Sequence, residues 1–289
     1  MHNASGIRRI LKDNGLSVNK ALGQNFLVHA GKRDEIISLC GICRHETVLE
    51  IGPGLGALTE GIQPMCANMI AVEKDRGFSD FLKRYFADSG NIEIVNSDIL
   101  RYKIPDFGEK VKVVGNLPYY ITSAVIFHML CQKSRIGSMF FTVQKEVADR
   151  ITAGPACKDY GMLTIGISYH CTAKKLCKIG RGSFFPAPAV DSALIELNVR
   201  QCPAVHVASE EYFFKLIKAG FNKRRKTLYN ALECAPGLGL DRAAIMDAFS
   251  LLKINPRVRA EELGLEEMAK LSEALSPHSR TDKPRGPEF

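Results

Sequence analysis

Four short segments carry residue types that together could hold a nucleoside and act on an amine. Residues 52–56 read Gly-Pro-Gly-Leu-Gly, Glu73 and Asp98 follow, and residues 116–119 read Asn-Leu-Pro-Tyr. Glycines let the backbone approach a ligand closely. A carboxylate can accept both hydroxyls of a ribose, and a second carboxylate could accept from an adenine amino group. The Asn amide oxygen can accept from an amine, and the Tyr ring can stack on a flat base.

Each of these segments follows a short apolar run of the kind that forms a buried parallel strand. The runs are residues 47–51, 69–72, 92–95 and 111–114, and residues 138–143 form a fifth. Helical patterns separate the runs, and this alternation predicts an α/β fold with a doubly wound parallel sheet. Because ligands bind outside the carboxyl ends of such strands, we expect the four segments at one edge of the sheet.

The pattern changes after residue 152. We expect a helix at residues 160–169, strands at 174–179 and 192–199, and four helices at 210–221, 224–232, 241–251 and 265–275. This organisation predicts a first domain of residues 1–202 and an all-helical domain of 203–275. Residues 276–289 are rich in Pro, Ser and charge, so we expect a disordered tail. The polar, basic residues 1–20 are expected to form a loosely held arm.

Composition narrows the class of protein. The 289-residue chain has a net charge of +8, which raises the expectation of a polyanionic partner, nucleic acid first. No apolar run approaches the ~18 residues that would span a membrane. The nine scattered cysteines favour reduced thiols and a cytoplasmic location. Cys40 and Cys43 have C-x-x-C spacing without a second pair, so we predict small buried hydrophobes and no metal site.

The glycine segment alone leaves its ligand open, because it lacks the G-x-G-x-x-G spacing of dinucleotide-binding folds. A dinucleotide oxidoreductase would use the glycines and Glu73, but it would leave residues 116–119 without a role. The complete ordered set describes an adenosine held next to a group that reacts with it.

At this point the sequence resembles a known family. Residues 50–59 look like the S-adenosylmethionine loop of the ribosomal RNA adenine N6-dimethyltransferases, closest to the KsgA-like small-subunit branch. Residues 23–27, 116–119 and 184–192 are similar to its other motifs in the same order, and the resemblance covers about residues 20–275. It implies a Rossmann-like methyltransferase domain with a helical RNA-binding domain. It also implies dimethylation of two adjacent adenines in a 3′-terminal hairpin loop of 16S rRNA, by a monomer acting on an assembling 30S particle.

The resemblance also implies roles for individual residues. The Asn116 side chain and the Leu117 carbonyl would accept from the target amine, Pro118 would stiffen the loop, and Tyr119 and Phe184 would stack on the two faces of the base. The cofactor contacts would be Gln24, Asn25, Leu27, Gly52, Gly54, Glu73, Asp98, Ile99 and Asn116.

A basic stretch at residues 218–229 carries five positive charges and no acid, which favours a helix that contacts RNA phosphates. The predicted RNA-binding residues are Lys223, Arg224, Arg225 and Lys226, and the resemblance adds Arg257 and Arg259.

Three positions depart from the family pattern. Tyr120 stands where many members have Asn, Lys74 where an apolar residue is frequent, and Ala189 where Lys or Arg is common. Two alternative functions also stay open. One is a large-subunit RNA methylase of the erythromycin-resistance type, and the other is a ribosome-assembly factor whose catalysis is secondary.

Overall fold

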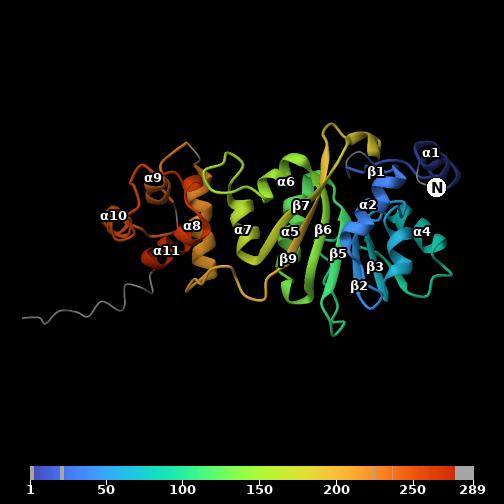
Figure 1. The fold of residues 1–289 in the computed structure, drawn as a ribbon, viewed down its shortest axis with the longest axis horizontal. Coiled ribbons are helices and arrows are strands. Elements are labelled where there is room, and N and C mark those ends of the chain that lie inside the picture. Colours follow the sequence, from blue (N-terminus) through green and yellow to red (C-terminus); the bar gives the residue numbers. More distant parts are fainter. Residues whose placement is uncertain (1–2, 20–22, 224, 236, 277–289) are drawn as a thin grey trace, which may run out of the picture. The chain divides into compact units, whose positions relative to one another are not determined.

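The computed structural model describes residues 3–19, 23–223, 225–235 and 237–276. The chain forms two compact units (Figure 1). The first contains residues 1–148 and 172–199, and the second contains residues 149–171 and those from 200 onward.

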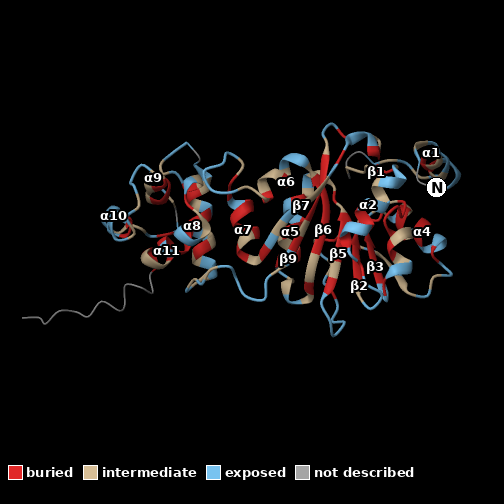
Figure 2. Ribbon diagram, in the orientation of Figure 1, coloured by how far each residue is buried: buried red, intermediate tan, exposed pale blue. Residues whose placement is uncertain are grey.

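The first unit is built on a seven-stranded sheet in the order β4-β3-β2-β5-β6-β9-β7. Strands β4, β3, β2, β5 and β6 are parallel, and β9 runs antiparallel to β6. Every residue of β2 is buried, Thr47 and Glu50 included, and Figure 2 shows buried residues along the strands. The strands are β2 (Thr47–Ile51), β3 (Asn68–Glu73), β4 (Ile92–Asn96), β5 (Val111–Asn116), β6 (Ile136–Gln144), β7 (Cys171–Ile179) and β9 (Ser192–Val199).

The strand order creates a crevice at the carboxyl edge of the sheet. From β2 the chain moves outward to β3 and β4, and then returns to place β5 on the other side of β2. At such a reversal the connections after β2 and β5 diverge, and ligands bind between them. The sequence prediction of a doubly wound parallel sheet is therefore confirmed, with β9 as an antiparallel addition.

Short helices connect the strands of this unit. They are α2 (Ala30–Cys40), α3 (Thr59–Ile62), α4 (Arg76–Tyr85) and α5 (Thr122–Leu130). Helix α6 (Lys145–Ile151) begins in this unit and ends in the second. The Asp75 carboxylate caps α4 by accepting from the Phe78 N–H at 3.2 Å, which fixes the helix start directly after β3. Cys40 is buried at the end of α2, but Cys43 is exposed, so the prediction that both are buried is wrong for Cys43.

The predicted N-terminal arm is a helix instead. Residues Ala4–Asp13 form α1, and the Asn3 side chain caps it by accepting from the Gly6 N–H at 2.7 Å. Ile7 and Leu11 are buried against Phe26 and Phe78. The polar composition concealed this because few side chains of the helix, Ile7, Ile10 and Leu11, pack against the core.

Residues 26–27 form a two-residue strand, β1 (Phe26–Leu27), that pairs antiparallel with β8 (Phe184–Phe185). This pairing joins two segments that the sequence separates widely and that the resemblance had marked as motifs. The peptide bond between Phe185 and Pro186 is cis.

The second unit is helical, with α7 (Met162–His170), α8 (Glu210–Asn222), α9 (Leu228–Glu233), α10 (Arg242–Leu251) and α11 (Leu265–Leu275). The predicted boundary at residue 202 assigned residues 149–171 to the first domain, whereas the structure places them in this unit. The reason is that Ile165 and Tyr169 bury their side chains beside Phe213 in the helical core. Of the predicted tail, only Ser276 falls within the described residues.

The basic stretch does not form the predicted helix. Helix α8 ends at Asn222, and α9 begins at Leu228 with Thr227 as its cap. Lys223, Arg225 and Lys226 therefore lie in the connecting turn, and Arg224 lies outside the described residues.

Candidate active site

One cavity gathers the chemistry-bearing residues at the carboxyl edge of the sheet. It is lined by loops that follow β2, β3, β4 and β5, together with residues 23–27 and Ile7 of α1. All the residues predicted to contact a cofactor line it: Gln24, Asn25, Leu27, Gly52, Gly54, Glu73, Asp98, Ile99 and Asn116. The parallel strands bring the glycine loop, Glu73, Asp98 and Asn116 together because they end at one edge of the sheet, whereas residues 24–27 reach the cavity from the segment that contains β1.

The glycine loop after β2 needs its glycines for two different reasons. Gly52 and Gly54 have φ angles of +66° and +61°, a region that residues with a side chain rarely adopt. A Cβ on Gly52 would meet no atom within 4 Å, so the backbone borders open space. A Cβ on Gly54 would come within 3.1 Å of the Phe26 ring. The loop thus exposes bare backbone to a ligand on one side and packs tightly on the other.

Glu73 ends β3 and faces this loop. Its Oε2 accepts from the Gly54 N–H at 3.0 Å and its Oε1 from the Asp75 N–H at 2.8 Å. Burial raises the pKa of the Glu73 carboxyl, and these backbone donors partly oppose the rise. Because each carboxylate oxygen can accept more than one hydrogen bond, both remain able to bind a vicinal diol.

Asp98 follows β4 and is held from two sides. Its Oδ1 accepts from the Leu100 N–H at 3.0 Å, and its Oδ2 lies 2.9 Å from Lys74 Nζ. Lys74 holds the pKa of the Asp98 carboxyl below its usual range, so the group is an ionised acceptor. The sequence showed Lys74 only as a departure from a family pattern, because the ion pair joins turns after two different strands.

Asn116 ends β5, and its amide is oriented by a neighbouring segment. Its Nδ2 donates to the Asn25 carbonyl at 2.7 Å. Asn25 in turn donates from its own Nδ2 to the Gly23 carbonyl at 3.0 Å. Because a carbonyl accepts only from a donor, Asn116 Nδ2 must face Asn25, and Oδ1 is left as the acceptor for another group.

The loop after Asn116 is fixed to the adjoining strands. The Leu117 N–H donates to the Thr142 carbonyl at 3.2 Å, and Leu117 is buried. The Tyr119 hydroxyl lies 2.6 Å from the Ser192 hydroxyl of β9. Pro118 lines the cavity, whereas Leu117 and Tyr119 do not, so only part of the predicted catalytic segment borders the cavity.

Phe184 lies behind the cavity wall. It pairs with Leu27 in the β1–β8 ribbon, is 4% exposed, and packs in a core cluster with Leu27 and Leu194. Leu27 lines the cavity and Phe184 does not. The structure thus brings the motif to the site but does not place this ring in the cavity itself.

Sequence reasoning missed several cavity-lining residues. Glu50 is 2% exposed, and its Oε2 accepts from the Thr59 hydroxyl at 2.6 Å. Burial raises the pKa of Glu50 to about 8. Tyr120 is 60% exposed at the cavity, with its ring beside Gly23. Glu50 could have been noticed in the sequence, because it is a charged residue inside a mostly apolar strand. No sequence signal marked Ile7, which was expected to lie in a loosely held arm.

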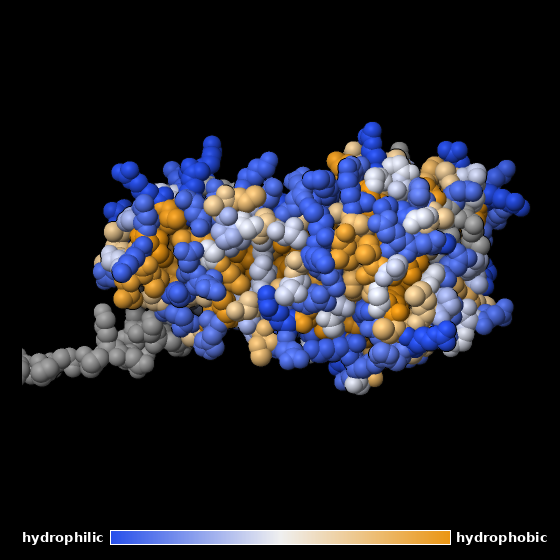
Figure 3. All heavy atoms as spheres, in the orientation of Figure 1, coloured by the Kyte–Doolittle hydropathy of each residue, from blue (hydrophilic) through white to orange (hydrophobic). Residues whose placement is uncertain are grey.

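Five of the six predicted RNA-binding residues lie in the described part of the helical unit. The Leu228 N–H donates to the Val258 carbonyl at 2.7 Å, which brings residues 255–259 beside the turn between α8 and α9. We call the exposed residues Lys223, Arg225, Lys226, Arg257 and Arg259 the cationic turn cluster. Figure 3 shows one face of the molecule, on which hydrophilic and hydrophobic residues are interspersed.

Two features of other classes of protein, a metal-binding cluster and a membrane-spanning helix, are absent from the described residues. Within the described residues, no group of three or more His, Cys, Asp or Glu side chains could hold a metal ion. In the same part of the chain, no helix has the length and apolar character needed to cross a bilayer.

The sheet order defines a Rossmann-like fold with the cavity at its carboxyl edge, and the solved structures that resemble it identify the class as the S-adenosylmethionine methyltransferases. A dimethyladenosine transferase from Plasmodium falciparum is 25% identical, with a TM-score of 0.73 over 84% of this chain and 94% of that chain. The 23S rRNA methyltransferase ErmE is also 25% identical, with a TM-score of 0.68 over 87% and 99% of the two chains.

Sequence similarity identifies one family within this class. The family model described as ribosomal RNA adenine dimethylase matches residues 15–276. Ribosomal RNA small subunit methyltransferase A of Clostridium botulinum is 37% identical over 89% of this chain and 94% of its own. The protein of the same name from Geobacter metallireducens is 39% identical over 92% and 98%. The chain belongs to the ribosomal RNA adenine dimethylase family, and its methyl donor is S-adenosylmethionine. The expected family, fold class and cofactor are confirmed.

Proposed function

We propose that this enzyme dimethylates N6 of two adjacent adenines in a 3′-terminal hairpin loop of 16S rRNA, acting as a cytoplasmic monomer on an assembling 30S particle. Relatives named as small-subunit methyltransferases support the choice of RNA, because they match at 37–39% identity over nearly their full lengths. The observation that carries the chemistry is the orientation of Asn116, whose Nδ2 is engaged by Asn25.

The reacting amine explains why that orientation matters. An adenine N6 amine is a poor nucleophile because its lone pair is delocalised into the ring. Acceptors on both N–H bonds favour a tetrahedral nitrogen with an available lone pair. Asn116 Oδ1 is turned away from Asn25 and can serve as one acceptor; we assign the Leu117 carbonyl as the other.

The remaining residues position the reactants. S-adenosylmethionine, when bound, supplies a methyl group already activated by its sulfonium. Glu73 would hold the ribose of the cofactor, and Asp98 would accept from its adenine amino group. The glycine loop would let the cofactor approach the backbone closely. Holding two reactants in line accounts for much of the acceleration in such transfers, and this fits a loop tied to β6 and β9.

The flipped base needs stacking partners. We assign Tyr119 to one face, with its ring direction fixed by the hydroxyl contact to Ser192. Phe184 is the proposed partner on the other face. Because Phe184 is 4% exposed, that role requires Leu27 or the β1–β8 ribbon to shift when the base enters.

The direct test is methyl transfer from labelled S-adenosylmethionine to unmethylated small ribosomal subunits, with the modified nucleotides mapped. Asn116→Ala should lower the transfer rate by on the order of 10²–10³, the typical cost of removing one group that stabilises developing charge. Affinity for the methyl donor should stay within about tenfold, because Glu73 and Asp98 remain. Asn198→Ala, an exposed change on β9, is the matched control. Unchanged dimethylation by Asn116→Ala would refute the assignment.

The similarity to ErmE makes large-subunit RNA the second candidate substrate. Parallel assays with immature small subunits and protein-free 23S rRNA separate the two. We expect methylation of the small subunit, and preferential methylation of 23S rRNA would reverse the choice. If Asn116→Ala restores small-subunit maturation in cells that lack the enzyme, binding rather than catalysis is the main role.

A further inference from the structure

Lys74 and Asp98 form an ion pair inside the cofactor cavity. Both residues line the cavity, Lys74 directly after β3 and Asp98 after β4. Lys74 Nζ lies 2.9 Å from Asp98 Oδ2, while Asp98 Oδ1 is fixed by the Leu100 N–H. One edge of the cavity therefore presents a cationic donor next to an anionic acceptor.

The two partners differ in how firmly they are held. The Asp98 side chain is 26% exposed and anchored by backbone, whereas the Lys74 side chain is 55% exposed. An ion pair with so exposed a lysine contributes little stability, and the flexible stem can redirect the ammonium group at small cost. Lys74 can therefore turn toward an acceptor on a bound ligand while Asp98 stays in place.

Purine bases differ in the hydrogen-bond donors and acceptors that they would present to Lys74 and Asp98. Adenine offers an N6 donor and an N1 acceptor, so Asp98 alone can recognise its amino group. A 6-oxopurine such as hypoxanthine reverses both roles, with an O6 acceptor and an N1–H donor. Facing Asp98 alone, O6 would be repelled. With Lys74 beside it, O6 can accept from Nζ while N1–H donates to the carboxylate.

We propose that Lys74 is a specificity-determining residue that lets this cavity accept 6-oxopurine nucleosides as well as adenine nucleosides. The inference rests on the proposed role of Asp98 at the purine of the cofactor. It adds a ligand class, S-inosyl compounds, to the adenosyl compounds that the family uses.

The test is calorimetric titration with S-adenosylhomocysteine and S-inosylhomocysteine. Lys74→Met keeps a stem of similar length and removes the donor. We expect it to weaken the inosyl ligand by about tenfold or more, since O6 loses the donor, and to weaken the adenosyl ligand by a smaller factor, since Asp98 stays in place. Lys74→Arg keeps a donor and should retain inosyl binding within about threefold of wild type.

Arg101→Met is the matched control. Arg101 is exposed and does not line the cavity, yet after Lys74 and the Leu100 N–H it also lowers the pKa of Asp98. The change therefore removes a nearby charge without removing a donor from the cavity. If Arg101→Met shifts the adenosyl-to-inosyl ratio as far as Lys74→Met does, general electrostatics explains the effect and the proposal is overturned.

The remaining outcomes separate this inference from the proposed cofactor site. If the protein binds the adenosyl ligand and Lys74→Met leaves the adenosyl-to-inosyl affinity ratio unchanged, the role of Lys74 is overturned and the cofactor site is not. Adenosyl affinity unaffected by Asp98→Ala would instead remove the cofactor assignment of Asp98, and this proposal with it. Thermal unfolding of the Lys74 and Arg101 variants, expected within a few degrees of wild type because both cations are exposed, confirms that their fold is intact.

Discussion

Glu50 shows at the scale of one residue how the fold changes an ordinary side chain. It sits within a fully buried strand next to the glycine loop, and its Oε2 accepts a hydrogen bond from the Thr59 hydroxyl. Burial disfavours the charged form and raises the pKa from 4.5 to about 8. The folded protein therefore keeps this proton at pH values where the unfolded chain has released it.

We expect that proton to make stability fall as pH rises. Between pH 4.5 and about 8 the folded state binds one more proton at Glu50 than the unfolded state, so the free energy of unfolding decreases with pH. The expected slope from this group is about 1.4 kcal/mol per pH unit. Glu50→Gln stays neutral and should lack this contribution.

Urea unfolding of wild type and Glu50→Gln at pH 5, 6, 7 and 8 measures it. The difference in unfolding free energy between the two proteins should shift steadily in favour of the variant as the pH increases. Two parallel pH profiles would mean that Glu50 is ionised in the folded protein.

At the scale of elements, the close approach of β5 to β2 sets the position of Asn116. Gly115 is paired with Ile51, and a Cβ on Gly115 would lie 2.9 Å from the Ile51 carbonyl oxygen. That distance is too short for a real contact, so the strands could not keep their spacing. The glycine is required by packing, because its φ is not in the left-handed region.

Gly115→Ala should therefore destabilise the protein by about 1–3 kcal/mol, as overpacking in a core does. It should also weaken binding of S-adenosylmethionine, because β5 carries Asn116 away from the glycine loop. Gly137→Ala in β6 is the control, since its new Cβ would be 3.7 Å from the nearest atom, an ordinary contact. Equal effects of the two changes on cofactor affinity would contradict this account.

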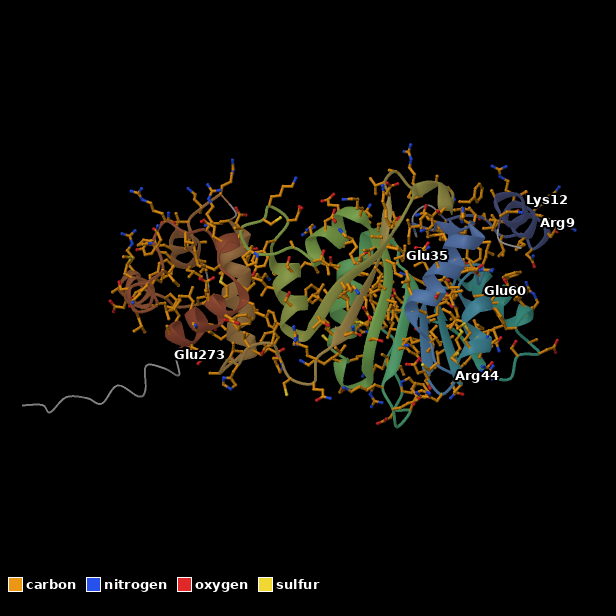
Figure 4. The ribbon with its side chains drawn as sticks, in the orientation of Figure 1. Arg9, Lys12, Glu35, Arg44, Glu60 and Glu273 are labelled. Carbon is orange, nitrogen blue, oxygen red and sulfur yellow. The ribbon has the colours of Figure 1, made fainter. Side chains whose placement is uncertain are left out.

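Helix α1 contributes one residue to the cavity from outside the sheet. Ile7 is fully buried and lines the cavity, while the Arg8 guanidinium lies 5.0 Å from the Phe185 ring of β8. Figure 4 labels Arg9 and Lys12 on the same helix, and both are exposed. One face of α1 thus contributes to the site and the other is solvated.

Ile7→Ala should release α1 from the core. A buried Ile→Ala change typically costs about 2–5 kcal/mol, and a terminal helix opens locally before the whole domain does. Hydrogen exchange should show reduced protection over residues 4–13 together with weaker cofactor binding. Lys12→Ala should leave both unchanged, and preserved protection in Ile7→Ala would show that α1 is held by other contacts.

At the scale of the whole molecule, the net charge of +8 favours a polyanionic partner, and five exposed cations gather in the cationic turn cluster of the helical unit. The cationic turn cluster unites residues from two segments through the backbone bond between Leu228 and Val258. Neutralising phosphates releases counterions, so these residues should affect the salt dependence of RNA binding more than its sequence preference.

Changing Lys223, Arg224, Arg225 and Lys226 to Ala should make the plot of log affinity against log salt shallower. The expected change in slope is about 0.7–0.9 for each RNA phosphate that the variant no longer neutralises. A control variant with the same charge change replaces four other exposed cations by Ala: Arg44, Lys83, Arg84 and Lys110. Arg44 and Lys110 precede strands β2 and β5, and Lys83 and Arg84 lie in the last turn of α4, so all four are at the amino edge of the sheet. Figure 4 labels Arg44 near the lower end of the sheet, and Figure 1, in the same orientation, labels β1 near the upper end. An unaltered slope in the first variant would exclude this cluster as the RNA surface.

Local signals in the sequence were enough to predict the succession of parallel strands and the residues at their carboxyl ends. Hydrophobic runs and glycine turns are such signals, and parallel strands necessarily end together. That is why Glu73, Asp98 and Asn116 could be assigned to one cavity in advance. Gln24, Asn25 and Leu27 line the same cavity, but only the family resemblance had implied their place there.

Contacts between residues distant in sequence settled which side chains face the cavity and which support it. The burial of Phe184, the ion pair of Lys74 with Asp98, and the packing of Ile7 all depend on such contacts. The assignment of residues 149–171 to the helical unit and the position of the cationic turn have the same origin. Periodicity reports that a face is apolar, but it does not report which other face covers it, and the covering face is what places each group at the site.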